Sequence, residues 1–137
     1  MKLEIKFRAC LNSKYYENQR MLSWEELLSQ YDAIDMFQKD LMTLMQYTGL
    51  HDKNGREIYE SDILRVERND DPNDFYIAPV SWCGGDYPAF DILPKYWPHW
   101  VNYDTNALSA IYAGWSEEVM TVIGNIHEDP DLLEATK

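Results

Sequence analysis

A run of turn-forming residues between short apolar segments, residues 46–64, restricts the fold more than any other part of the chain. In the turn 52–55, Asn54-Gly55 tolerates the positive φ angles that a tight hairpin needs at both central positions. A second turn at 60–62 follows only a few residues later. Extended pieces this short, joined by turns, are typical of antiparallel strands. The segment therefore predicts a fold built from closely spaced hairpins.

Strand-like segments recur along most of the chain. Residues 3–9 alternate apolar and charged side chains, which predicts a half-buried strand. Further strands are predicted near 15–22, 42–48, 57–59, 63–67, 75–82, 87–93 and 118–126. Residues 42–48 also fit a continuation of the preceding helix, but their β-branched threonines and the following Gly49 favour a strand. Gly84-Gly85 predicts a hairpin between the segments 75–82 and 87–93.

Helical patterns are fewer. Ser23 and Glu26 form a capping-box pattern, and apolar residues then recur at helical spacing, which predicts one longer helix over 24–38. A short helix is predicted over 106–113, capped by Asp104 or Thr105, and a short C-terminal helix over 130–135. Because strands and helices do not alternate, a parallel sheet is not expected. The prediction is a mainly β (α+β) fold, a small barrel or roll of short antiparallel strands in one domain, residues 1–137.

The charge of the chain bounds its partners. It has 137 residues, of which 45% are hydrophobic and 14% aromatic, as in a folded globular domain. It carries 24 acidic against 12 basic side chains, a net charge of −12, so direct binding to nucleic acid is not expected. The excess of acid fits a solvated surface, attraction of a basic partner, or imitation of a phosphate backbone that occupies a nucleic-acid-binding protein.

The cysteines and the hydropathy of the chain bear on its compartment. Residues 1–4 lead directly into a strand pattern rather than a signal peptide, and no apolar run approaches the ~20 residues that span a bilayer. We therefore expect a cytoplasmic protein with no membrane contact. Cys10 and Cys83 are expected to be reduced there, although a disulfide between them stays open because sequence does not give the required geometry.

Three segments, 5–9, 46–62 and 122–133, resemble in order the signature blocks of the YopX family. The central block contains the residues that would form the family turn: Gly49, Asp52, Asn54, Gly55, Tyr59 and Asp62. The resemblance implies a phage- or prophage-encoded protein with an SH3-like barrel component that forms a homo-oligomer. It supplies no catalytic residues. The chain departs from the family pattern at Cys10, Ser61 and His127.

No pattern of residues points to catalysis, a cofactor or a metal. His51-Asp52 is better explained as a turn than as an acid–base pair, and Gly55 falls too early for a calcium loop. The aspartates of residues 70–74 match no metal-site spacing, and the cysteines and histidines are scattered singly. The sequence therefore predicts a non-enzymatic protein with no cofactor.

The aromatic segment 87–115 is the candidate functional region. Trp and Tyr concentrate at binding hot spots, but the segment has one basic residue, Lys95, where a nucleic-acid platform needs several. Core packing and a protein-contact surface both remain open. The candidate interface residues are Tyr96, Trp97, His99, Trp100, Tyr103 and Trp115. The leading hypothesis is an accessory protein that acts through self-association and protein–protein contacts, and the alternative is an acidic decoy of a host nucleic-acid-binding protein.

Overall fold

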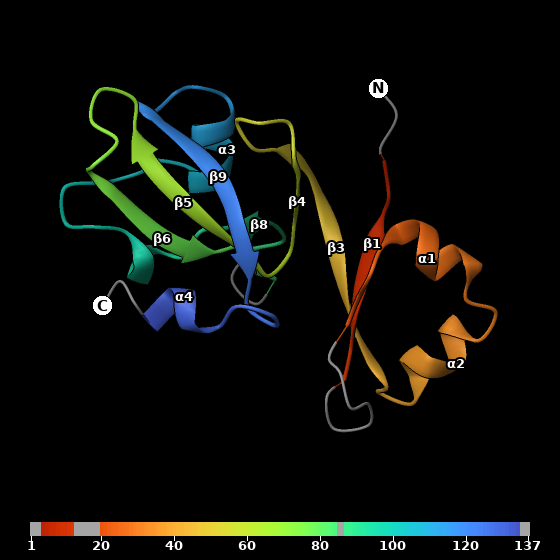
Figure 1. Ribbon diagram of the computed structural model, residues 1–137. Helices are drawn as coiled ribbons and strands as arrows, with labels where there is room; N and C mark the ends of the chain where they lie inside the picture. The colour runs from red at the N-terminus through yellow and green to blue at the C-terminus, as the bar shows by residue number, and fades with distance from the viewer. Residues whose placement is uncertain (1–3, 13–19, 85–86, 135–137) are drawn as a thin grey trace.

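The computed structural model, which describes residues 4–12, 20–84 and 87–134, is mainly β with several short helices (Figure 1). Its strands form a four-stranded sheet of order β2-β1-β3-β4, a three-stranded sheet of order β6-β5-β9, and the pair β7-β8. The first sheet with its helices is called the N-lobe here, and the rest the C-lobe. The strands are β1 Phe7–Leu11, β2 Met21–Leu22, β3 Met42–His51, β4 Glu57–Tyr59, β5 Asp62–Arg68, β6 Phe75–Pro79, β7 Ser81–Trp82, β8 Phe90–Asp91 and β9 Glu118–Asn125. The helices are α1 Trp24–Ser29, α2 Ala33–Gln38, the 3-10 turn η1 Pro94–Tyr96, α3 Ala107–Tyr112 and α4 Asp131–Glu134.

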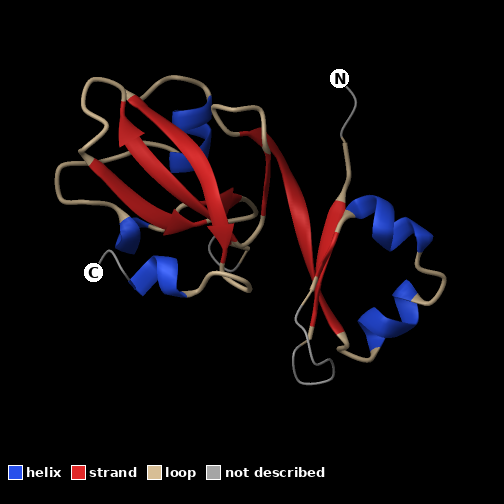
Figure 2. Ribbon diagram, viewed as in Figure 1, coloured by secondary structure: helices blue, strands red, loops and turns tan. Residues whose placement is uncertain are grey.

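The N-lobe is a small sheet covered on one side by α1 and α2 (Figure 2). Strand β1 pairs antiparallel with both β2 and the first half of β3. Its buried cluster contains five residues: Ala9, Leu22, Leu27, Met36 and Met42. The strand predicted over 15–22 is seen in its last two residues as β2, and its earlier part lies outside the described residues.

The single helix predicted over 24–38 is wrong, because the segment forms two short helices. The capping box is present: Ser23 Oγ accepts from the N–H of Glu26, and Glu26 Oε1 accepts from the N–H of Ser23, both at 3.2 Å. Helix α1 then stops at Gln30, whose backbone is extended and whose side-chain amide donates to Asp32 Oδ1 at 2.5 Å. Such local polar contacts compete with continuation of a helix. The break lets Leu27 and Met36, one from each helix, reach the same sheet.

Strand β3 joins the two lobes. It continues past the predicted end at residue 48 to His51, and Figure 1 shows it running from the N-lobe sheet toward the C-lobe. Its register with β4 shifts between Tyr47 and His51, as in a β-bulge, and Gly49 in between has φ +87°. Ile58 of β4 is fully buried in the C-lobe cluster, so the joint itself is part of a core.

The C-lobe is a curled antiparallel half-barrel in which β5 is central, between β6 and β9 (Figure 1). Its buried cluster draws on β4, β5, β6, β9, α3 and the residues between β6 and α3. The cluster consists of Ile58, Leu64, Val66, Tyr76, Ala78, Val80, Ile92, Ala107, Leu108, Ile111, Met120 and Val122. The mainly β prediction is thus confirmed, while the SH3-like character of the half-barrel stays a prediction.

The hairpin predicted around Gly84-Gly85 is much shorter than expected. Residues 75–79 pair with β5, and only β7 and β8, two residues each, pair across the turn. Backbone contacts with β5 continue past Pro79, because the N–H of Val80 donates to the carbonyl of Asp62 at 2.8 Å, so this part of the segment pairs with β5 rather than across the turn. Gly85 lies outside the described residues.

The strand predicted over 3–9 begins later than expected, because β1 covers Phe7–Leu11 and residues 4–6 are not in a strand. The other elements agree with the predicted ones within a residue or two. Helix α3 is capped by Asn106, whose side chain accepts from the N–H of Ser109, rather than by Asp104 or Thr105. Strand β9 and helix α4 occupy the predicted positions. Cys10 and Cys83 are both buried thiols. Among the described residues, none of the helices has the length and apolar character that crossing a membrane requires.

Candidate functional site

The residues of the central signature turn fasten the hairpin of β3 and β4 to the C-lobe. Asp52 is buried, and its Oδ1 accepts from the N–H groups of Asn54 and Arg56, both at 2.9 Å. Its Oδ2 accepts from the N–H of Val122 on β9 at 3.0 Å. Burial by itself would raise the pKa of Asp52, but these three donors outweigh it and hold the pKa below its ordinary 3.8. The carboxylate is therefore a structural clamp, and Gly55, with φ +83°, closes the turn that presents it.

A second buried carboxylate ties β1 to the start of β5. Asp62 is 1% exposed, and its Oδ1 accepts from the Arg8 guanidinium at 2.6 Å. Its Oδ2 accepts from the N–H of Tyr59 at 2.7 Å, while the Arg8 guanidinium lies over the Tyr59 ring. Burial raises the pKa of Asp62, and the charge of Arg8 opposes that rise. The signature residues thus build the joint between the lobes rather than an open site.

Near this joint two ring or guanidinium nitrogens are buried without a hydrogen-bond partner among the described residues. They are Arg8 Nε and His127 Nε2. Burial, followed by the charge of Arg8, lowers the pKa of His127 below its ordinary 6.5. The imidazole is accordingly held in its neutral form more strongly than a free histidine would be.

The predicted interface residues divide into a packed group and an exposed group. Tyr96, Trp97 and Tyr103 pack against the C-lobe cluster. Trp97 donates from Nε1 to the carbonyl of Ile92 at 3.0 Å and meets Tyr103 edge to face. His99, Trp100 and Trp115 are exposed. The structure therefore does not gather all six side chains on one surface.

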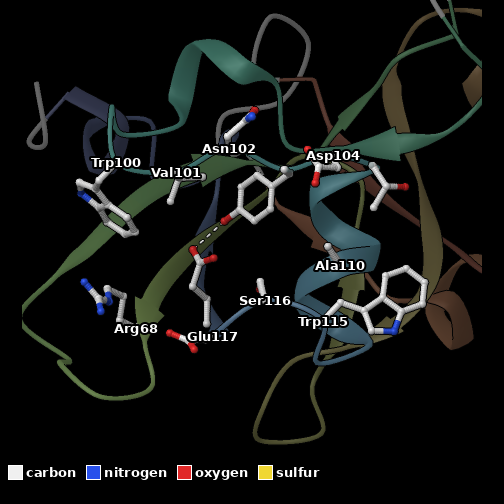
Figure 3. Close-up of a pocket in the computed structure, with 12 residues that line it drawn as sticks. Arg68, Trp100, Val101, Asn102, Asp104, Ala110, Trp115, Ser116 and Glu117 are labelled. Atoms are coloured by element: carbon white, nitrogen blue, oxygen red, sulfur yellow. Dashed lines mark hydrogen bonds between the residues drawn. The ribbon is translucent and has the colours of Figure 1, made fainter.

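A cleft of about 490 Å³ lies beside this segment and brings together Trp100, Tyr103 and Trp115 (Figure 3). Figure 3 shows Trp100 and Trp115 at opposite ends of the cleft. Its polar lining includes Arg68, Asp104, Ser116, Glu117 and Glu118. Sequence reasoning did not associate these residues, because Arg68 comes from β5 and the acids from the loops on either side of α3 and from β9. A cleft of this size with aromatic ends suits the side chains of a bound ligand.

Two lining residues of the cleft, Tyr103 and Glu118, form a hydrogen-bonded chain with Tyr76, which lies outside the lining. Tyr103 donates to Glu118 Oε2 at 2.6 Å, the contact dashed in Figure 3, and its oxygen lies 2.6 Å from the hydroxyl of Tyr76. Burial raises the pKa of Tyr103 and of Tyr76 well above the ordinary 10. Both phenols therefore stay protonated and act here as hydrogen-bond donors, which compensates the buried Glu118.

The N-lobe has a different kind of surface, a groove of about 700 Å³ beside α1 and α2. Four large apolar side chains of this region are exposed: Leu28 by 66%, Tyr31 by 96%, Ile34 by 77% and Phe37 by 49%. They belong to the apolar pattern that predicted one helix, but they line this groove and are not part of the lobe's buried cluster. The sequence carried a signal for this surface, because the apolar residues over 24–38 are too many for the single buried face of a short helix.

The remaining polar side chains weighed from the sequence do not form a site. Asp52 is occupied by backbone donors, while His51 lies 3.2 Å from the Tyr47 hydroxyl, so they do not act as a pair. In the aspartate loop, Arg68 lies within 3.0 Å of Asp70 and 3.4 Å of Asp74. Among the described residues, no three His, Cys, Asp or Glu side chains come together as metal ligands do.

The described residues define a class of mainly β proteins with a curled half-barrel and a signature turn locked by buried carboxylates. The model of the YopX protein family matches residues 5–134, and the chain belongs to that family. A comparison with curated proteins finds no match. Among solved structures, the crystal structure of protein EF1440 from Enterococcus faecalis is similar, with a TM-score of 0.51 and 22% identity. The alignment covers 96% of this chain and 99% of that one, which supports a shared fold.

Proposed function

We propose that this protein is a non-enzymatic phage or prophage accessory protein that acts in the host cytoplasm through protein–protein contacts, beginning with contacts between copies of its own chain. Its membership of the YopX family supports the phage origin and the SH3-like reading of the half-barrel. The observation that carries self-association is the exposed apolar face of α1 and α2, defined by Leu28, Tyr31, Ile34 and Phe37.

The size of this face fits an interface between copies. At ~200 Å² for a large side chain, the four residues expose on the order of 600 Å². A standard interface buries about 800 Å² on each partner, and the largest patch on most monomers is about 300–600 Å². With the neighbouring rim, the face therefore supplies enough area for a stable contact.

The charge distribution favours a second copy at this face. Two chains of net charge −12 repel each other over most of their surfaces. Among the described residues that line the groove beside α1 and α2, two are charged, Asp32 and Asp35, and Asp35 is paired with Lys39 at 2.9 Å. Contact between two copies at this face therefore removes a large apolar area from water while bringing few negative charges together.

Sedimentation velocity of the full chain over a wide range of concentration tests the proposal. We expect an oligomer whose share grows with concentration, and a monomer when Ile34→Glu places a charge in the middle of the face. The matched control is Tyr112→Glu, which alters another exposed helical position in the C-lobe and should assemble normally. A wild-type chain that stays monomeric, or an Ile34→Glu chain that assembles like it, would overturn the assignment.

The acidic decoy is the second candidate, and a cluster of acids favours it. The loop with Asp70 and Asp71 lies next to Glu117, because the N–H of Asn69 donates to the Glu117 carbonyl at 2.8 Å. All three carboxylates are exposed on that face of the C-lobe. A captured nucleic-acid-binding protein should be released steeply by salt. Capture from host lysate that resists salt would count against the decoy.

A further inference from the structure

We propose that the cleft between Trp100 and Trp115 binds an extended basic segment of a partner protein and places an Arg or Lys side chain against its carboxylates. This inference rests on the proposed function in one respect, that the protein works by contacting other proteins. It concerns the C-lobe, so it is separate from the apolar face of α1 and α2.

The charge of the lining selects a cation. Asp104, Glu117 and Glu118 line the cleft against one basic residue, Arg68, which gives three negative charges and one positive, or −2. Arg68 is itself paired with Asp70 at 3.0 Å and with Asp74 at 3.4 Å, outside the lining. An entering guanidinium or ammonium therefore finds carboxylates whose charge the lining does not balance.

The aromatic ends of the cleft suit the same ligand. Tryptophan is the best aromatic partner for a cation above its ring. The Arg68 guanidinium already lies 5.9 Å from the centre of the Trp100 ring, which shows one such contact within the site. Trp115 is 74% exposed and makes no ring or cation contact with the described residues. Its face is open to a side chain that enters from a partner.

A third observation is that one carboxylate of the cleft is fixed in place. Glu118 is buried, and the Tyr103 hydroxyl donates to its Oε2 at 2.6 Å. This carboxylate therefore needs no rearrangement when a ligand arrives.

The shape of the cleft favours an extended segment over a single small cation. Its volume of about 490 Å³ exceeds what one side chain fills, and Figure 3 places the two tryptophans at its ends with the polar groups between them. An extended strand points successive side chains to opposite sides, so alternate residues can contact the two ends while the backbone crosses the polar centre. Saccharides also stack on tryptophan, but the net charge of the lining favours the cation.

The test follows the indole N–H signals of the full chain by two-dimensional NMR while a short peptide of alternating arginine and glycine is added. The protein has five tryptophans, so Trp24, Trp82 and Trp97 serve as internal references for Trp100 and Trp115. We expect saturable shifts at Trp100 and Trp115 alone. A peptide with citrulline, which is uncharged and similar in shape, should bind at least tenfold more weakly.

Variants separate the cleft from general acidity. Glu117→Gln and Trp115→Ala should each weaken the arginine peptide several-fold. The matched controls Glu25→Gln and Trp82→Ala change exposed residues outside the cleft and should not. Equal binding of the citrulline peptide, equal weakening by Glu25→Gln, shifts at all five indoles, or a response to maltohexaose but not to the peptide would overturn the proposal. No shift at any peptide concentration would also overturn it.

The two proposals fail separately. Trp115→Ala should leave sedimentation unchanged if copies meet at α1 and α2, and Ile34→Glu should leave peptide binding unchanged. Peptide binding by a chain that never assembles would retain the cleft and remove self-association. Assembly without peptide binding would do the reverse.

Discussion

The two lobes bury their apolar side chains in different ways. The C-lobe encloses a cluster of twelve buried residues between its sheet, α3 and the connecting segments, while the N-lobe encloses five. Besides its smaller core, the N-lobe has four exposed large apolar side chains in α1, α2 and the turn between them. The comparison teaches that one lobe encloses its large apolar side chains while the other leaves several exposed, which is the basis of the proposed contact between copies.

The two buried carboxylates at the joint between the lobes are both hydrogen-bonded. Each buried carboxylate of the signature turn is used fully: Asp52 accepts from three backbone N–H groups, and Asp62 from Arg8 and Tyr59. The lobes are thus held together by buried polar contacts as well as by the fully buried Ile58. Perturbing the joint should therefore affect both lobes, unlike changes on the α1 and α2 face.

The largest effect is expected from Asp62→Asn. The change leaves the Arg8 guanidinium, which is mostly buried, without its negative partner, and removal of one member of a buried ion pair costs about 3–5 kcal/mol. Urea unfolding should show this loss in both lobes at once. Asp70→Asn, an exposed acid, is the control and should change stability by less than about 0.5 kcal/mol. A loss below about 1 kcal/mol would mean that the lobes are held together by apolar packing alone.

A matched pair of leucines tests the difference between closed and open cores. Leu64→Ala removes a fully buried side chain from the C-lobe and should cost about 3 kcal/mol in urea unfolding. Leu28→Ala, at a residue that is 66% exposed, should cost little in a dilute sample and should reduce any dependence of stability on protein concentration. If Leu28→Ala were as destabilising as Leu64→Ala at every concentration, the N-lobe face would belong to a core of its own.

The clamp at Asp52 should give the next largest effect. Asp52→Ala leaves the N–H groups of Asn54, Arg56 and Val122 without their acceptor, at a cost of about 2–3 kcal/mol. Amide hydrogen exchange should become faster at Val122 and in the turn, while β1 is little changed. The control is Asp71→Ala, at an exposed position of the aspartate loop. Unchanged exchange at Val122 would show that the turn does not need its carboxylate to dock on β9.

The smallest effect is expected from the pH dependence of His127. Its pKa lies below 6.5 in the folded chain because burial and the charge of Arg8 oppose protonation, while the unfolded chain takes up the proton near 6.5. Between the lowered pKa and 6.5 the unfolded state binds more protons, so stability falls as the pH drops through that interval. Asp52, Glu26 and Glu67, whose pKa values are also lowered, add a loss of stability in the same direction, at more acidic pH.

Thermal unfolding of His127→Gln should lack the loss that begins just below pH 6.5. His99→Gln, at an exposed site in the C-lobe, should retain it. A wild-type melting temperature that stays constant from pH 7.5 to pH 5.5, a range that contains the ordinary histidine pKa, would contradict the neutral state of the buried imidazole.

Much of the fold follows from local patterns of the sequence. The family resemblance, the mainly β class, the capping box at Ser23 and Glu26 and a turn at residues 52–55 were predictable, because each depends on neighbouring residues or on backbone preference. Of the two central residues expected to take a positive φ, however, only Gly55 does so, and Asn54 does not. The break at Gln30 and the shortened hairpin at 81–91 were not foreseen. There, a local side-chain contact at Gln30 and the pairing of residues 75–80 with β5 decided between patterns that looked equally regular.

The candidate sites were decided by the tertiary structure. The aromatic segment was visible in the sequence, but its division into packed Trp97 and exposed Trp115 depends on how η1 and α3 sit on the half-barrel. The cleft needs Arg68 from β5 beside Glu117, residues separated by about a third of the chain. Sequence by itself determines short-range preferences and total charge; which acids lie beside which aromatics follows only from strand pairing and packing, because those contacts join residues that the sequence keeps far apart.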